Sequence, residues 1–181
     1  GSASQLFISN GDKFKKSTQL SFEKDKSTEG VSGAFFDADN DGDQDLLVGA
    51  GGNEYRKGIE SFNTLYYLND GKGNFTREIV KAPIAKGQVG CIKPFDIDKD
   101  GDLDLFLGGR AVPGVYGLTP RSFVFENDGK GNFSDITNEN TGPIGMVTDA
   151  IWKDVNNDNW ADLIVDGEWM PITVFLNNNG G

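Results

Sequence analysis

The chain has no histidine, one cysteine and no long apolar run. Without histidine, the most common general base, the relay residue of catalytic triads and the most common zinc ligand are all missing. A single cysteine excludes an internal disulfide, and Cys91 lies in the apolar context Val-Gly-Cys-Ile, which favours a buried structural thiol over a reactive one. No apolar run approaches the ~20 residues of a membrane span, so membrane insertion is not expected.

Basic residues are also scarce. The chain has 17 Lys and Arg against 28 Asp and Glu, and its net charge of -11 argues against nucleic-acid binding, which relies on clustered cations. No signal peptide is recognised, and Gly1-Ser2 resembles a cloning remnant, so targeting information is expected to lie outside this sequence. The 181 residues suffice for one sizeable core, and 25 glycines favour strands joined by tight turns.

The abundant feature is an acidic loop. In Asp96–Asp104, aspartates occupy alternate positions, glycine is sixth, and the apolar run Leu-Phe-Leu follows. Calcium takes about six to eight oxygen ligands, and such loops supply them from alternate positions, with the seventh contributing its backbone carbonyl and glycine permitting the turn. The loop recurs at spacings of 59 and 58 residues. The predicted ligands are Asp37, Asp39, Asp41, Asp43 and Asp45; Asp96, Asp98, Asp100, Asp102 and Asp104; and Asp154, Asn156, Asp158, Trp160 and Asp162.

Acidic loops of this kind have two other interpretations. An EF-hand requires Glu at position 12, where this chain has Leu107, so an EF-hand is excluded. A solvated acidic turn is argued against by three in-phase copies, two of which keep the glycine. The third loop departs from the pattern, since Asn156 replaces a carboxylate and Asn159 replaces the glycine, although Asn tolerates the left-handed conformation. We therefore expect up to three Ca²⁺ ions, with the third bound most weakly.

Strands flank each loop with the same period. One apolar stretch enters the loop (31–36, 89–95 and 147–152), one leaves it, and a hairpin follows through the related turns 69–75 and 127–133. Asp-Gly and Gly-x-Gly indicate hairpin turns; a phosphate cradle is the alternative, but no helix follows.

Four short antiparallel strands per unit predict an all-β fold, a β-propeller built of four-stranded antiparallel blades. The chain would hold about three and a half blades, as a partial propeller or half-ring. In this reading 1–181 is one segment, with the end of a blade at 1–29, blades at 30–85 and 86–142, and a partial blade at 143–181. Aromatic residues on the strands are expected in the core between blades: Phe35, Phe36, Phe95, Phe106, Phe125, Trp152 and Phe175.

At these loops and strands the chain resembles the FG-GAP/VCBS repeat family, whose calcium-loop blades also occur in integrin α subunits. The pattern D-x-D-x-D-G-x-x-D occurs three times in phase, with the departures at Asn156 and Asn159, and its copies span essentially the whole chain. The stretches 145–152 and 167–172 also look like bacterial surface proteins that carry an ASPIC/UnbV domain. The resemblance implies a calcium-stabilised propeller used for binding, located extracellularly, on the cell surface or in the periplasm.

Candidate ligand contacts lie in the links between the second and third strands, at 51–63, 109–121 and 166–171. Because these links are equivalent in each unit, we expect them on one face. Their aromatic and guanidinium groups suit sugars or acidic groups. The candidates are Tyr55, Arg56, Arg110, Tyr116, Arg121 and Trp169. The alternative is that these side chains pack against neighbouring blades or pair with the acidic loops.

Together these patterns favour a non-catalytic, calcium-binding module of a surface or secreted protein that recognises a glycan or a protein. The alternatives are the propeller part of a polysaccharide-degrading enzyme and a purely structural spacer. Unpaired strands at the two ends of the segment invite association, so a homo-oligomer that completes the ring is also expected.

Overall fold

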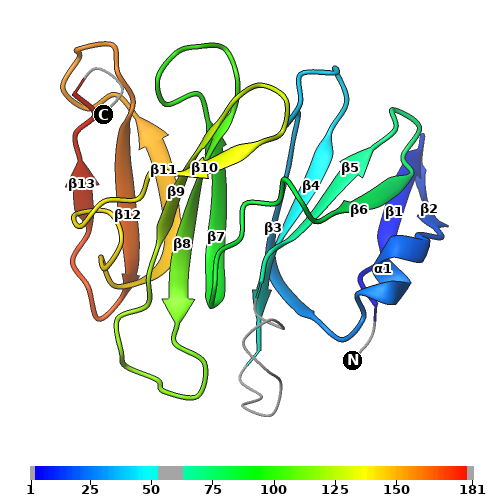
Figure 1. Cartoon of the computed structure of the whole chain (residues 1–181), viewed down its shortest axis with the longest axis horizontal. Helices are drawn as coiled ribbons and strands as arrows, with labels where there is room; N and C mark the ends of the chain where they lie inside the picture. The colour runs from blue at the N-terminus through cyan, green and yellow to red at the C-terminus, as the bar shows by residue number, and fades with distance from the viewer. Residues whose placement is uncertain (1–2, 53–62, 179–181) are drawn as a thin grey trace.

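The structure, a computed structural model, describes residues 3–52 and 63–178. It confirms the all-β prediction, since the strands form four antiparallel sheets (Figure 1). A two-stranded sheet comes first, and two four-stranded sheets and a three-stranded sheet follow. Their strands are β1 (Leu6–Asn10) and β2 (Lys13–Ser17); β3 (Glu29–Phe36), β4 (Asp45–Gly51), β5 (Leu65–Asn69) and β6 (Phe75–Glu78); β7 (Gln88–Phe95), β8 (Asp104–Ala111), β9 (Phe123–Asn127) and β10 (Phe133–Asp135); and β11 (Met146–Lys153), β12 (Asp162–Glu168) and β13 (Thr173–Phe175).

Each sheet is a simple meander in which strands adjacent in sequence pair with each other. In the three larger sheets the acidic loops join the first two strands, and the ninth loop position is the first residue of the second strand. It pairs there with the last residue of the first strand, as Asp104 does with Phe95. Thus the sequence repeat is also a repeat of strand register.

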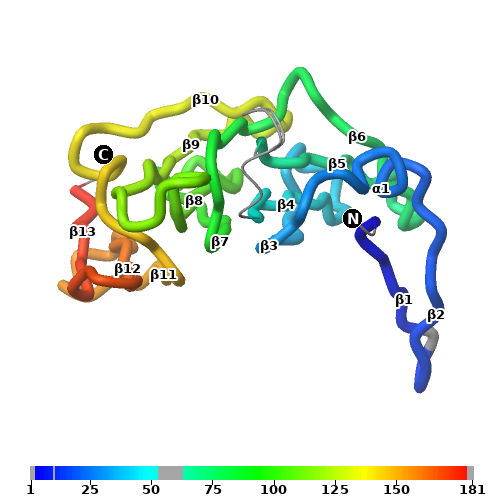
Figure 2. The backbone as a smooth tube through the Cα atoms, turned by 90° about the horizontal axis from the view of Figure 1, so that it is seen from below, coloured from blue at the N-terminus to red at the C-terminus, as the bar shows by residue number. Residues whose placement is uncertain are grey.

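Two apolar layers lie between the three larger sheets, which follow one another along an arch (Figure 2). The first layer includes Leu47, Tyr66 and Leu105, and the second includes Phe106 and Val147. Inner strands make the contacts, with β3 and β4 against β7, and β7 and β8 against β11. Burial of one sheet face against the next is therefore what holds successive repeats together.

The expected aromatic core needs one correction. Phe36, Phe106 and Phe125 are buried, and Phe95, Trp152 and Phe175 pack against the second layer. Phe35 is 51% exposed and touches only the edge of Phe75 among the aromatic rings. Trp152, which stands two residues before its loop as Phe35 does, stacks on Phe95 of the preceding sheet. Among the described residues, the element that precedes the first sheet is the two-stranded β1–β2 hairpin, and no aromatic ring of it contacts Phe35.

A short helix, α1 (Leu20–Lys24), was not anticipated from the sequence. It covers the outer side of the first sheet, where Phe22 is buried against Tyr67 and Phe75. The side chain of Gln19 donates to the carbonyl of Gly73 at 2.8 Å and accepts from the amide of Phe75 at 3.0 Å, as a further strand would. Among the described residues no helix is long and apolar enough to cross a membrane.

Candidate metal sites and ligand surface

The three acidic loops share one backbone conformation. Position 4 is left-handed in each, with φ of 59° at Asn40, 66° at Lys99 and 64° at Asn157. Position 6 is left-handed as well, at Gly42, Gly101 and Asn159. At position 7 the amide donates to the position-5 aspartate in every loop, at 2.7 to 3.1 Å. The asparagine of the third loop therefore takes the conformation that glycine has in the other two.

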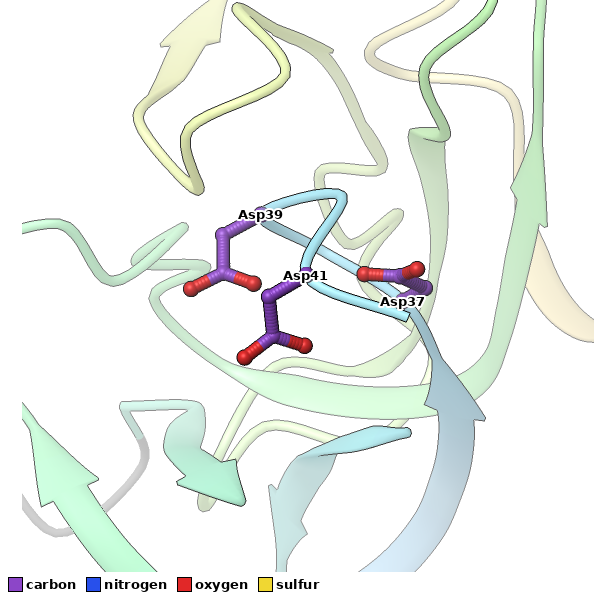
Figure 3. Close-up of side chains that lie close together, drawn as sticks. All are labelled: Asp37, Asp39 and Asp41. Atoms are coloured by element: carbon purple, nitrogen blue, oxygen red, sulfur yellow. The ribbon is translucent and has the colours of Figure 1, made fainter. Parts of the chain in front are cut away.

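Carboxylates converge in the first two loops. Ligand oxygens of Asp37, Asp39 and Asp41 all lie within 4.8 Å of one another, and Figure 3 shows the Asp37 carboxylate turned toward the other two. The second loop gathers Asp96, Asp98 and Asp104 in the same way. Several loop carboxylate oxygens are buried and have no hydrogen-bond donor in the described parts of the chain. They belong to Asp37, Asp39, Asp43, Asp96 and Asp102. Buried acceptors without donors, grouped in this way, fit a hard cation such as Ca²⁺.

Position 7 offers more than the predicted backbone carbonyl. The side chain of Asp102 is only 7% exposed, and one of its oxygens has no donor among the described residues. Burial, together with the neighbouring Asp100 charge, raises the pKa of Asp102 to about 7. This carboxylate is consequently costly to ionise unless a cation lies nearby.

The aspartates at position 9 have a double role. Asp45, Asp104 and Asp162 are almost fully buried at the start of the second strand. One oxygen of each accepts the amide of position 2, at 3.2, 2.9 and 2.9 Å respectively. Burial, only partly opposed by backbone hydrogen bonds, raises the pKa of both Asp45 and Asp104 to about 6. The position-9 carboxylate therefore closes the loop by accepting a backbone amide from its beginning. The same carboxylate is also available to a metal.

An asparagine at the end of the third strand, or two residues beyond it in the third sheet, extends this network, and sequence reasoning missed it. The amides of Asn69, Asn127 and Asn177 donate to the second oxygen of the position-9 aspartate, at 2.8, 2.8 and 3.0 Å. The side-chain amide of Asn127 then reaches the carbonyl of Ala38 in the first loop at 2.8 Å, and that of Asn177 reaches Ile97 in the second loop at 3.0 Å. The first and second acidic loops are thereby each tied to the following sheet. The recurrence of asparagine at this point was the available signal.

In the third loop, the carboxylate oxygens of Asp154 and Asp158 already accept hydrogen bonds from donors within the loop. Both oxygens of Asp154 accept backbone amides, from Asn157 at 2.7 Å and Asn159 at 2.9 Å. Despite some desolvation, which raises it, these hydrogen bonds lower the pKa of Asp154. The side-chain amide of Asn156 also donates to Asp158 at 2.8 Å. No loop oxygen here is among the buried acceptors without donors in the described chain, so this loop fits a cation less well than the first two.

We predict that Asn156→Asp raises the calcium affinity of the third loop at least tenfold. The change restores a carboxylate and removes the amide that now satisfies Asp158. Isothermal titration of wild type and variant measures it, with Asn157→Asp as a neighbouring charge-matched control outside the alternating ligand positions. A wild-type third site as tight as the other two would contradict the prediction.

The links that follow β8 and β12 lie at the opposite end of the strands from the acidic loops (Figure 1). Three predicted ligand residues come together there. Arg110, near the end of β8, forms an ion pair of 2.6 Å with Glu168 of the next sheet, and Tyr116 donates its hydroxyl to the other oxygen of Glu168. Trp169 packs edge-on against Tyr116, with centroids 5.4 Å apart. The hydrogen bonds from Arg110 and Tyr116 hold the pKa of Glu168 at about 2. Glu168 was not predicted, although it is the residue before Trp169.

The remaining predicted ligand residues are not part of this cluster. The guanidinium of Arg121 instead lies over the ring of Phe123, and its Nη2 is 3.7 Å from Oδ2 of Asp135. Tyr55 and Arg56 lie outside the described residues. For Arg110, the alternative interpretation holds for one terminal nitrogen, because Nη2 pairs with Glu168 of the neighbouring sheet. The other terminal nitrogen, Nη1, is buried and has no acceptor among the described residues.

A cavity of about 260 Å³ adjoins this cluster. Arg110 and Tyr116 line it together with Gln88, whose side chain donates to the carbonyl of Gly52 at 2.7 Å. Trp169 has a backbone φ of 56°, a left-handed conformation that is unfavourable for a bulky residue. Strain of this kind is concentrated at functional sites. Its side chain is also largely in solvent, since the residue is 78% exposed.

No model of a known protein family matches the chain, and a search of the curated proteins finds no relative. The chemistry of the acidic loops and of the Arg110 cluster is therefore the basis for assigning a function.

Proposed function

We propose that the chain is a calcium-stabilised β-propeller segment of the FG-GAP/VCBS type that binds a glycan without converting it. The order of the sheets along an arch and the regular meander within each support the propeller architecture. The buried carboxylate oxygens without donors support calcium in the first two loops. Such a module belongs to a surface, secreted or periplasmic protein, where calcium is abundant.

The observation that carries the binding role is the Nη1 of Arg110 beside the cavity, which is buried and has no acceptor among the residues that the structure describes. Glu168 occupies one side of the guanidinium, so its orientation is set before any ligand arrives. A sugar hydroxyl or carboxylate would supply the missing acceptor. The aromatic rings of Tyr116 and Trp169 would face the apolar side of a sugar.

A protein ligand is the second candidate, because exposed Trp, Tyr and Arg are also typical of interface hot spots. Glycan-array binding followed by titration of the best ligand distinguishes the two. We expect Arg110→Gln to weaken glycan binding at least tenfold, whereas Arg121→Gln, which removes a guanidinium outside the cluster, leaves it unchanged. Release of cleaved product would favour the enzyme alternative, and silence toward every glycan would contradict the proposal.

Trp169 provides a test that separates function from folding. We predict that Trp169→Gly keeps or raises the melting temperature, because glycine removes the left-handed strain of about 1 kcal/mol while an exposed ring loses little packing. The same change should lower ligand binding at least tenfold. Thermal melts and ligand titrations on one preparation measure both effects, and a large fall in melting temperature would show that Trp169 is structural.

A further inference from the structure

The Arg110 cluster, which consists of Arg110, Tyr116, Glu168 and Trp169, has a charge pattern that bears on which sugars it can bind. Among the described residues that line the cavity of about 260 Å³, Arg110 is the one that carries a charge. This charge is already matched, because Nη2 lies 2.6 Å from Oε1 of Glu168. Hydrogen bonds from Arg110 and Tyr116 hold the pKa of Glu168 at about 2, so this carboxylate is ionised at neutral pH. The cluster is therefore neutral overall.

Close packing holds the side chains of this cluster in place. A Cβ added to Gly90 of β7 would lie 3.2 Å from both Cβ and Cδ of Arg110, so glycine at this position makes room for the arginine stem. Trp169 is packed in a similar way, since a Cβ added to Gly117 would lie 3.3 Å from its ring. A ligand of Arg110 therefore meets a preformed cluster in which Glu168 is already present.

The guanidinium of Arg110 is poorly arranged for an anionic ligand. A carboxylate is bound most strongly when two N–H groups donate in parallel to its two oxygens. Here Nη2 is engaged with Glu168, and Nη1 is the terminal nitrogen that is buried without an acceptor among the described residues. A carboxylate at Nη1 would lose its hydration close to the charge of Glu168, and the described lining of the cavity holds no second cation to compensate for this loss.

A neutral sugar matches the same groups better. A sugar hydroxyl both donates and accepts a hydrogen bond, and the cluster offers partners for both. Nη1 of Arg110 is the donor. Tyr116 uses its one proton toward Glu168 and so keeps its oxygen as an acceptor. The net charge of the chain, -11, also repels anionic ligands at long range, and it stays negative even if three Ca²⁺ ions add six positive charges.

We propose that the Arg110 cluster selects neutral sugars over carboxylated ones, with Glu168 as the residue that determines this specificity. The inference rests on the proposed glycan-binding function and names the class of glycan. Glu168 acts in two ways, because it orients the guanidinium through Nη2 and repels a carboxylate that approaches Nη1. Removal of its charge with its shape kept therefore leaves Arg110 uncompensated and lets the cluster accept an anionic sugar.

Matched oligosaccharides test the selectivity. An array carries neutral hexose oligomers, each printed beside the same oligomer oxidised at C6 to the uronate, and the pair that binds best is then titrated by calorimetry with the whole chain. Wild type should bind the neutral member at least tenfold more tightly than the uronate. Glu168→Gln should bind the uronate at least tenfold more tightly than wild type does, while its affinity for the neutral member changes less than threefold. Glu126→Gln removes an exposed carboxylate of β9 outside the cluster and should leave both affinities unchanged.

The possible outcomes separate this inference from the glycan-binding proposal. Wild type that binds the uronate as tightly as its neutral partner would overturn the inference and leave glycan binding in place. If Glu168→Gln weakens the binding of both members alike, Glu168 only positions Arg110, and its role in selectivity is overturned. Silence of wild type and variant toward every member of both series would overturn the inference together with the glycan-binding proposal.

Discussion

Chelation of calcium is expected to lower the melting temperature by about 10 to 20 °C. If calcium is about 100-fold above its dissociation constant, each occupied site contributes about 2.7 kcal/mol, and a chain of this size shifts by roughly 2 to 4 °C for each kcal/mol. Two well-formed sites account for the estimate. The mechanism is repulsion, since carboxylates about 4 Å apart destabilise the empty loop by about 1 to 4 kcal/mol for each pair. Differential scanning calorimetry with calcium and with excess chelator measures the shift.

A charge-matched pair of variants tests where the shift originates. Asp98→Asn gives the second loop an asparagine at position 3, as the third loop has at Asn156. It should therefore halve the fall in melting temperature that chelator causes. Glu126→Gln removes an exposed carboxylate on β9, away from the loops, and should leave the effect intact. Identical melts with and without chelator would show that the loops are acidic turns and not metal sites.

Replacement of the position-9 aspartate should destabilise the fold even when no calcium is present. Asp104 is 2% exposed and accepts the amides of Ile97 at 2.9 Å and Asn127 at 2.8 Å. Asp104→Ala leaves both buried amides without an acceptor, at about 1 to 3 kcal/mol each. Relief of the buried carboxylate offsets part of this loss, because burial raises the pKa of Asp104 to about 6. We expect a net loss of about 2 to 4 kcal/mol, a large share of ordinary domain stability.

The comparison with Asp100→Ala isolates this structural role. Asp100 is exposed, and its carboxylate accepts the amide of Asp102, two residues on, at 3.1 Å. Urea unfolding in excess chelator should show a large loss for Asp104→Ala and a small one for Asp100→Ala. In saturating calcium both variants should be destabilised. Equal effects of the two variants in chelator would mean that position 9 acts only through the metal.

Much of the fold was predictable because its signals are local. Alternating aspartates, a glycine at position 6 and the apolar runs around them repeat in phase, so loops and strands could be placed without knowledge of distant contacts. The same local logic failed at Phe35, whose burial depends on a sheet that would precede it. It also failed at α1, where Gln19 and Phe22 are ordered by the edge of a sheet that comes later in the chain.

The candidate site divides in the same way. Sequence reasoning placed Arg110, Tyr116 and Trp169 on equivalent links, and the structure brings them together around Glu168, which had no distinguishing pattern. Arg121 was equally plausible by composition, but its backbone position turns it toward Asp135. Residue type indicated which side chains could bind a sugar or an acidic group. The direction in which each side chain points decided which of them belong to the Arg110 cluster.

By itself, the sequence determined the strand order, the repeat and the three loops, because coordination chemistry and turn geometry depend on neighbouring residues. Only the tertiary structure decided how successive repeats are joined. The asparagines that reach back to Ala38 and Ile97 connect segments that are 80 or more residues apart in the sequence. A local sequence pattern does not encode contacts over such a separation. The tertiary structure also placed Phe133 between the first and second sheets, where its ring packs against Tyr66 and Phe36.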